Sequence, residues 1–369
     1  MREGWEYKKL GDSCVIEYGT RVVQKKDGGT IYPVYGGGGE TFRMDKYNRE
    51  NCLVVARFAM SRTCVRYVTG KFFLNDSGLS INAGKELLQS YLNHHILHLN
   101  DDIYNLGKGA AQRNLDVNSF RNLIIAIPPL STQLSIVSEL DKINELIRLK
   151  KEQLKDYDNL AQSIFYEMFG DPVENQKGWE ERTMQDLCVN IVDCPHSTPK
   201  KVDYITDYPC IRTSELRGGS ISWATMQYLD EDEYNIRIAR LKPEAGDIVF
   251  GREGTIGDAV ILPLGYNFSL GQRTMLLRAD TSIVSNVFLH RTILSDWIKH
   301  QIEYVNVSST VAHVNIKDFK KFTVPLPPLP LQQLFAQRIE LIEKQKAEVQ
   351  RTISDLETLL ASRMQYWFD

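Results

Sequence analysis

Apolar residues recur at alternating steps of four and three in two long segments of the chain. In the first segment they fall at Ile136, Leu140, Ile143, Ile147, Leu154, Tyr157, Ala161, Ile164 and Met168, with Lys150 as a polar break. In the second they fall at Phe335, Ile339, Ile342, Val349, Ile353, Leu356, Leu360 and Trp367, with Lys346 as the break. A mean period of 3.5 residues over several heptads predicts two long helices in a coiled coil.

The same three residues, Pro-Pro-Leu, stand before each segment, at 128–130 and at 327–329. Proline fits before or at the first turn of a helix but not inside it, so each helix is expected to begin there. About 38 residues at 1.5 Å each make a rod of about 57 Å, too long to pack only on its own domain. Two rods with the same seam most simply pair with each other, in antiparallel orientation.

The segments before the two helices also form an internal repeat. "GWEYKKLGDSCV" at Gly4 returns as "GWEERTMQDLCV" at Gly178, and "LVVARFA" resembles "IVFGREG", which places Arg57 opposite Arg252. The offset between the copies grows along the chain, so the second copy carries extra residues, mostly before Arg252. Ordered matches of this kind indicate a duplicated module.

Each module opens with short β-branched and aromatic runs broken by Gly, Asn and Asp turns, which predicts a compact globule of strands with a few helices. The expected fold class is α+β: two similar globular domains, each followed by a long helix, with the two helices forming an antiparallel coiled coil. The expected domains are residues 1–130 and 173–328. The first helix and its linker take 131–172, and the second helix takes 329–369.

Composition narrows the class of protein. The chain is 43% hydrophobic and 25% charged, as in an average soluble protein, and it has no apolar run long enough for a membrane span. The polar N-terminus lacks an apolar signal core, and six scattered cysteines suit free thiols, so a cytoplasmic location is expected. A net charge of −3 does not favour nucleic acid, although a local basic surface remains compatible with it.

Two similar domains with a fixed spacer suit a target with two half-sites, such as double-stranded DNA with a gapped sequence. Arg and Lys bind phosphates and guanine edges, and Gln and Asn bind adenine. For any single residue, an ordinary solvated loop charge is the alternative. The DNA-binding candidates are Arg21, Lys25, Lys26, Arg57, Arg62, Lys108, Gln112 and Arg113 in the first domain, and Lys200, Lys201, Arg212, Arg217, Arg252, Arg273, Ser309 and His313 in the second.

No strong catalytic motif is present. Both Pro-Pro pairs are followed by Leu, where a DNA adenine methyltransferase needs an aromatic residue, and the glycines 36–39 do not form a dinucleotide turn. "GLSINAGKE" lacks the spacing of a phosphate loop, and the cysteines and histidines lack metal-ligand spacing. We therefore expect no catalytic, cofactor or metal site in the chain itself.

The order of parts resembles the specificity subunit of Type I restriction–modification enzymes. The matching features are the Gly-Trp start of each module, the "GREGTIG" turn and the "PPL" helix with Gln133 or Gln332 three residues on, and they cover essentially the whole chain. The resemblance implies that each globule is a target recognition domain for one half of a bipartite DNA sequence. It also implies that the helices dock two modification (methyltransferase) subunits, that restriction subunits join them, and that S-adenosylmethionine and ATP bind to those partners. No membrane partner is expected.

Other classes of function remain open from the residues alone. One is a coiled-coil scaffold whose globules bind proteins, and another is the specificity-type subunit of a related restriction system. A self-contained methyltransferase or nuclease is disfavoured by the missing motifs. DNA affinity that falls steeply with salt would favour the DNA reader over the scaffold.

Overall fold

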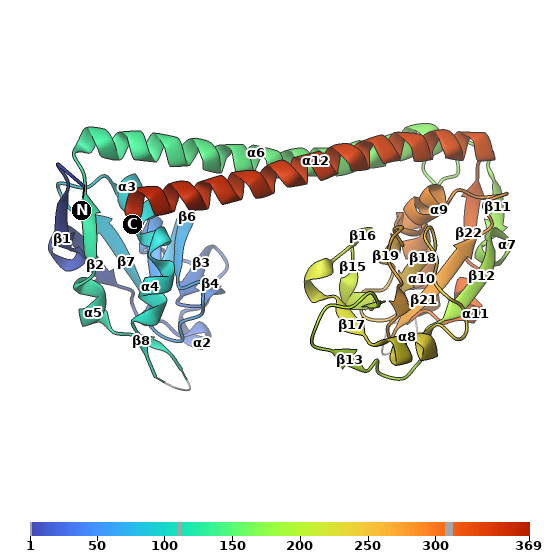
Figure 1. The fold of residues 1–369 in the computed structure, drawn as a ribbon, viewed down its shortest axis with the longest axis horizontal. Helices are drawn as coiled ribbons and strands as arrows, with labels where there is room; N and C mark the ends of the chain where they lie inside the picture. The colour runs from blue at the N-terminus through green and yellow to red at the C-terminus, as the bar shows by residue number, and fades with distance from the viewer. Residues whose placement is uncertain (1, 110–111, 307–312) are drawn as a thin grey trace. The chain divides into compact units, whose positions relative to one another are not determined.

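The computed structural model describes residues 2–109, 112–306 and 313–369. The chain forms two compact units (Figure 1). The first unit comprises residues 1–153 and 349–369, and the second comprises residues 154–348. Each unit therefore contains one globular domain and half of each long helix.

The first domain is built on a six-stranded sheet. Neighbouring strands are antiparallel except β3 and β6, which run parallel. In order across the sheet the strands are β2 (Cys14–Tyr18), β7 (Gly78–Ala83), β5 (Arg49–Ala56), β6 (Val65–Leu74), β3 (Tyr32–Gly36) and β4 (Gly39–Met44). Two small antiparallel pairs complete it: β1 (Glu6–Lys9) with β10 (Ile124–Ile127), and β8 (Gly107–Lys108) with β9 (Asn114–Leu115).

Helices cover one face of this sheet. Leu53, Val55 and Ile81 point from the strands into a core shared with Tyr91 and Ile96 of helix α3. These five side chains are fully buried, as expected where β-branched and aromatic residues pack at interior density. The helices of the domain are α1 (Leu10–Ser13), α2 (Gln24–Asp27), α3 (Gln89–His98), α4 (Asn100–Asn105) and α5 (Val117–Arg121).

The second domain has two four-stranded sheets. The first sheet is β12 (Cys188–Asp193), β21 (Thr274–Ala279), β18 (Ile248–Gly251) and β19 (Ala259–Ile261), and the second is β13 (Lys201–Val202), β17 (Gln227–Leu229), β14 (Pro209–Ile211) and β20 (Ser269–Leu270). The two-stranded pairs are β11 (Glu180–Thr183) with β22 (Thr323–Leu326), and β15 (Leu216–Arg217) with β16 (Ser220–Ile221). Its helices are α7 (Met184–Leu187), η1 (Thr213–Glu215), η2 (Trp223–Thr225), α8 (Glu231–Arg237), α9 (Asn286–Ile293), α10 (Asp296–Asn306) and α11 (Ile316–Phe319).

The two domains repeat the same backbone plan, as the sequence predicts. The N–H of Leu115 donates to the carbonyl of Arg57, and the N–H of Val314 donates to the carbonyl of Arg252. Each arginine directly follows a strand, β5 or β18, so the predicted pairing of Arg57 with Arg252 holds in the fold. Where β3 joins β4 through a glycine hairpin, the second domain inserts η1, β15, β16 and η2 between β14 and β17. The extra residues of the second copy therefore include this insertion.

The predicted long helices are present and pair in antiparallel orientation. Helix α6 (Leu130–Phe169) and helix α12 (Leu329–Phe368) each have 40 residues, and each begins at the leucine after Pro-Pro. In the first unit Glu139 of α6 forms an ion pair with Arg363 of α12, and Lys151 binds Glu357 at 2.8 Å. A rising residue number on α6 meets a falling number on α12, which is the antiparallel sense. The predicted coiled coil is thereby confirmed.

The two lysines that interrupt the apolar seam form ion pairs or hydrogen bonds with neighbouring polar side chains. In the second unit Lys346 contacts Asp158 at 2.7 Å and Glu343 at 3.3 Å, and its side chain is 19% exposed. In the first unit the Nζ of Lys150 donates to Gln153 at 3.0 Å. Most other seam residues are buried, so the two breaks are satisfied polar positions within an apolar interface.

A buried glutamine fastens each domain to its helix. The Oε1 of Gln133 accepts the N–H of Leu88, and its Nε2 donates to the carbonyls of Glu86 and Pro128, all at 2.8 Å. Gln332 repeats this pattern in the second unit, with the N–H of Ser285 at 2.8 Å and the carbonyl of Pro327 at 2.7 Å. Both glutamine side chains are fully buried. The backbone groups that they bond at each junction therefore depend on one side chain for their hydrogen bonds.

The C-terminal turn of each helix inserts into a domain core. Phe165 and Phe169 of α6 pack on Phe288 in the second domain, with the Phe169 and Phe288 ring centroids 4.8 Å apart. Phe368 of α12 stacks on His95 in the first domain at 4.6 Å. Each domain is therefore held by the start of one helix and the end of the other.

Within the described ranges, no helix is long and apolar enough to cross a membrane. All six cysteines are free thiols.

Candidate nucleic-acid interface

Arg57 is held between two aromatic rings where β5 ends in the first domain. Its guanidinium carbon lies 4.9 Å from the ring centroid of Tyr18 and 4.4 Å from that of Phe58. Tyr18 is the last residue of β2, and Phe58 follows Arg57 in the chain. The N–H of Arg57 donates to the carbonyl of Ser77 at 2.8 Å, so the backbone of this arginine is fixed on the sheet.

A second group of arginines that contact an aromatic ring lies in the same loop region. Arg62 and Arg113 both lie over the ring of Tyr104 in α4, at 4.8 and 4.7 Å from its centroid. Met60, which lies between Arg57 and Arg62 in sequence, donates its N–H to the carbonyl of Arg113 at 2.9 Å, which joins the two loops. We call Tyr18, Arg57, Phe58, Arg62, Tyr104 and Arg113 together the first-domain edge. The structure thus brings three of the predicted DNA-binding residues together.

The glycine hairpin between β3 and β4 also reaches this edge. Arg66 donates to the carbonyl of Gly37 at 2.9 Å, and the N–H of Gly37 donates to Ser77 at 3.0 Å. A side chain at Gly37 would meet the carbonyl oxygens of Phe58 and Ser77 at 2.7 and 2.9 Å. Glycine is therefore required here by close backbone packing, and no cofactor role is needed to explain it.

The remaining first-domain candidates are not part of that edge. Lys108 forms an ion pair with Asp116, and this hydrogen bond lowers the pKa of Asp116 to about 2. Arg21 lies in the connection after β2, and Lys25 and Lys26 lie on the exposed helix α2. Gln112 is exposed before β9. Their part in DNA binding stays a prediction.

In the second domain, the end of strand β18 has both basic and acidic side chains. The side chain of Arg252 is 13% exposed and contacts Asp193 at 3.1 Å and Glu253 at 3.7 Å. Arg273 contacts Glu253 at 3.3 Å, and His196 contacts Asp193 at 3.3 Å. We call these five residues the second-domain edge. Its arginines are compensated by carboxylates, in contrast to those of the first-domain edge.

Backbone strain accompanies this edge. Arg273 has φ +66°, a left-handed conformation that a non-glycine residue rarely adopts. Its carbonyl accepts the N–H of Arg252 at 2.9 Å, and the exposed His313 forms an isolated β-bridge with Glu253. Strained residues held by surrounding structure are common at functional sites.

Four other candidates of the second domain are spread over its loops. Both Nε and Nη2 of Arg212 donate to the fully buried carboxylate of Glu215, at 3.2 and 2.7 Å, so this guanidinium has a structural partner. Arg217 is exposed in β15, Lys200 is exposed before β13, and Lys201 lies 3.9 Å from Asp203. Ser309 lies outside the described residues.

The sequence did not single out the aromatic and acidic residues that complete both edges. Tyr18, Phe58 and Tyr104 support the arginines of the first domain, and Asp193 and Glu253 compensate those of the second. Phe58 and Glu253 directly follow Arg57 and Arg252, a signal that was available. Tyr104 and Asp193 are far away in the chain, and only the fold brings them near.

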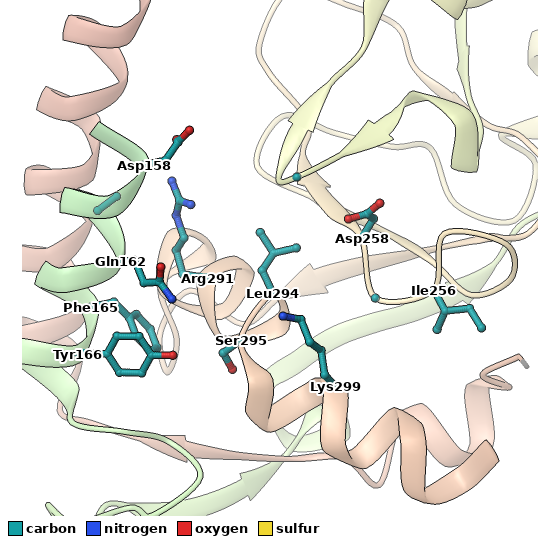
Figure 2. Close-up of a pocket in the computed structure, with 13 residues that line it drawn as sticks. Asp158, Gln162, Phe165, Tyr166, Ile256, Asp258, Arg291, Leu294, Ser295 and Lys299 are labelled. Carbon is teal, nitrogen blue, oxygen red and sulfur yellow. The ribbon is translucent and has the colours of Figure 1, made fainter. Parts of the chain in front are cut away.

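A cavity of about 510 Å³, lined by apolar and charged side chains, lies within the second unit between α6 and helices α9 and α10 (Figure 2). Arg291, Lys299, Asp158 and Asp258 line it, and burial raises the pKa of the Asp258 carboxyl. Lys299 binds Asp296 at 2.8 Å and Arg291 binds Glu343 at 3.2 Å, so both cations have acidic partners. The lining holds no histidine or cysteine and therefore lacks a nucleophile–base pair of the usual kind.

Metal chemistry has no evident site either. Among the described residues, no group of three or more His, Cys, Asp or Glu side chains is placed to hold a metal ion. His94 and His98 instead contact single carboxylates, Asp141 at 2.8 Å and Asp369 at 2.7 Å.

These features define a duplicated α+β protein with two loop edges and a pair of antiparallel helices. The chain belongs to the Type I restriction modification DNA specificity domain family, whose model matches residues 2–156 and again residues 176–357. The predicted resemblance is thereby confirmed for both modules.

Relatives with known names are distant in sequence. The chain is 21% identical over 275 residues to the Type I restriction enzyme MjaVIII specificity subunit of Methanocaldococcus jannaschii, a match that covers 69% of this chain and 64% of that protein. It is 20% identical over 349 residues to the putative type I restriction enzyme specificity subunit S.HindORF215P of Haemophilus influenzae, covering 92% and 87%. The chain thus spans less than two thirds of the MjaVIII subunit.

Solved structures share the fold along the whole chain. The S subunit of a Type I restriction–modification system from M. genitalium superposes with a TM-score of 0.58 at 15% identity, covering 99% of this chain and 96% of that one. A chain from a study of complex assembly and conformational transition of the type I R-M system gives 0.52 at 18% identity, covering 99% and 97%.

Proposed function

We propose that this chain is the DNA specificity subunit of a Type I restriction–modification enzyme. The observation that carries the proposal is the duplication itself: two domains of one backbone plan, each with arginines at the same strand end, and both matched by the family model. Each domain reads one half of a gapped double-stranded DNA target. The proposed action on DNA places the protein in the cytoplasm.

The loop edges suit the recognition of DNA. Arginine binds phosphates as a charge and guanine through two parallel hydrogen bonds, and both kinds of contact need an accessible guanidinium. Arg57, Arg62 and Arg113 are grouped in one domain. In the other, Arg273 is 63% exposed, whereas Arg252 is 13% exposed and has to leave Asp193 to reach DNA. The edges differ in chemistry, which suits a target whose two halves differ in sequence.

The helix pair suits the docking of partner subunits. Several leucines of α6 and α12 remain exposed although the seam between the helices is buried. Exposed apolar side chains mark interaction sites where they form a contiguous patch, and these leucines are our candidates for such a patch. The leucines are Leu134, Leu146, Leu149 and Leu160 on α6, and Leu334, Leu341 and Leu359 on α12. Only Leu160 and Leu359 stand at equivalent positions of the two helices, 199 residues apart. We propose that each helix contributes to the docking of one modification subunit.

Chemistry is assigned to the partners. We assign S-adenosylmethionine to the modification subunits and ATP to the restriction subunits, and membership of the specificity domain family supports this division of roles.

A methylation map tests the proposal. DNA and S-adenosylmethionine are incubated with this chain, with a partner modification subunit, and with both, and modified adenines are then located by sequencing. We expect methylation at one gapped motif only when both proteins are present. Methylation by this chain alone would reveal an active site of its own. A complex that forms and methylates no motif would favour the scaffold alternative.

A further inference from the structure

The two domain edges hold their arginines in different ways. At the first-domain edge, Arg57 contacts the rings of Tyr18 and Phe58, and Arg62 and Arg113 both contact the ring of Tyr104. Within the described ranges no carboxylate lies within 4.0 Å of these three guanidinium groups. At the second-domain edge, Arg252 and Arg273 each have an acidic neighbour within that distance.

Aromatic stacking restrains an arginine without using its hydrogen-bond donors. The ring contacts the face of the guanidinium, and the N–H groups lie in the plane at its edge. Most hydrogen-bond donors of the Arg57 guanidinium have no protein acceptor among the described residues. Its Nη1 donates to the carbonyl of Asp76, and this bond is long at 3.4 Å. A restrained guanidinium also loses less conformational freedom on binding than a flexible one.

Arg57 is the best placed of the three to contact a base. Its N–H donates to Ser77, in the turn before β7, and its carbonyl accepts the N–H of Leu115 in β9, both at 2.8 Å, so its backbone is fixed on two sides. Sequence is read at base edges by side chains held in a fixed place, and phosphate contacts set the register of the protein on the duplex. Arg62 lies in the exposed loop and Arg113 has only its Nε bonded, to the carbonyl of Gly107 at 3.0 Å, which suits phosphate contacts.

We propose that the first domain reads a guanine of its half-site through Arg57 in the major groove, with Arg62 and Arg113 on the flanking phosphates. The O6 and N7 of guanine form the acceptor pair that matches a guanidinium fork. Arg252, at the same backbone position, is already bonded to Asp193 and has to leave this partner to act in the same way. The inference rests on the proposed function and specifies the base that one domain recognises.

The test uses the full chain assembled with a modification subunit. The target motif of the unaltered complex is determined first, and the map is then repeated with Arg57→Ala and Arg57→Lys. We expect both variants to relax one G·C pair in one half-site, lowering discrimination there roughly 10- to 100-fold, with the other half-site unchanged. Lysine is not expected to restore discrimination, because its ammonium group lacks the two parallel N–H donors of a guanidinium. Arg43→Lys, which changes an exposed arginine paired with Glu40 on β4, is the matched control.

A base analogue gives an independent readout. Replacing the identified guanine by an analogue without the N7 acceptor should lower methylation by the unaltered complex and leave that by Arg57→Ala unaffected. Relaxation at an A·T pair, or an equal loss at every sequence, would overturn the inference and reassign Arg57 to a phosphate. If the unaltered complex methylates no gapped motif, the proposed function fails instead, so the two failures are distinguishable.

Discussion

Replacing Gln133 by methionine tests whether one buried side chain fastens the first domain to its helix. Methionine has nearly the same length but cannot bond the N–H of Leu88 or the carbonyls of Glu86 and Pro128. An unpaired buried polar group costs about 1–3 kcal/mol. The loss at Glu86 is smaller because this residue is exposed, and the apolar side chain of methionine regains a further part. We expect Gln133→Met to destabilise the first unit by about 2–4 kcal/mol.

Global unfolding of a chain with two units does not show which unit has lost stability. Hydrogen exchange followed by mass spectrometry does, because it measures the protection of each segment. Amide protection in α3 and the first turns of α6 should fall roughly 30- to 700-fold in Gln133→Met. Gln332→Met should affect the second unit by about 1 kcal/mol less, because one of its three bonds, to the carbonyl of Ile283, is 3.4 Å long. Gln337→Met, at an exposed position of α12, is the control. A folded Gln133→Met protein that loses less than about 0.5 kcal/mol would refute the reasoning.

Three further predictions concern spacing, recognition and pH. Deleting one heptad, residues 147–153, should keep the apolar period of α6 but change the permitted spacing between half-sites in the methylation map; unchanged spacing would exclude the helix as a spacer. Arg252→Ala removes the arginine partner of the 17%-exposed Asp193 and should weaken recognition of the half-site that Arg57→Ala does not affect. The methylation map reads this out, and an effect of both variants on the same half-site would contradict the pairing of the two arginines. Burial lowers the pKa of His95 to about 3, from an ordinary value near 6.5, so the unfolded chain takes up a proton first as the pH falls. The first unit should therefore lose stability progressively from about pH 6.5 towards pH 3, and His95→Leu should flatten this part of the pH–stability curve.

The sequence predicted those parts of the fold that follow from local periodicity and repetition. Helix starts at Leu130 and Leu329 could be read because Pro-Pro excludes a helix interior, and the seam was visible at steps of four and three. The insertion of Phe169 and Phe368 into the domain cores was not predicted, because it depends on contacts with residues far away in the chain.

The candidate site was predictable only in outline. Arg57 and Arg252 could be aligned because the strands before them repeat. Whether such an arginine is stacked on rings or bonded to carboxylates depends on Tyr18 and Asp193, which strands β2 and β12 bring to the edge. Pairing of this kind is set by sheet topology, which the apolar pattern does not encode. The base contacts of all the candidate residues stay predictions.

The ion pair between Glu139 and Arg363 also bears on which helices can associate when many copies of the chain are present. Helix α6 and helix α12 are related by the duplication, so two copies of α6, or two of α12, share the apolar seam needed to associate. In an α6–α6 pair with the same register Glu139 would meet Ile164, and in an α12–α12 pair Arg363 would meet Arg338. An unpaired or repelled charge at a partly buried position disfavours both exchanges. The ion pair therefore favours pairing of α6 with α12 over pairing of either helix with a second copy of itself.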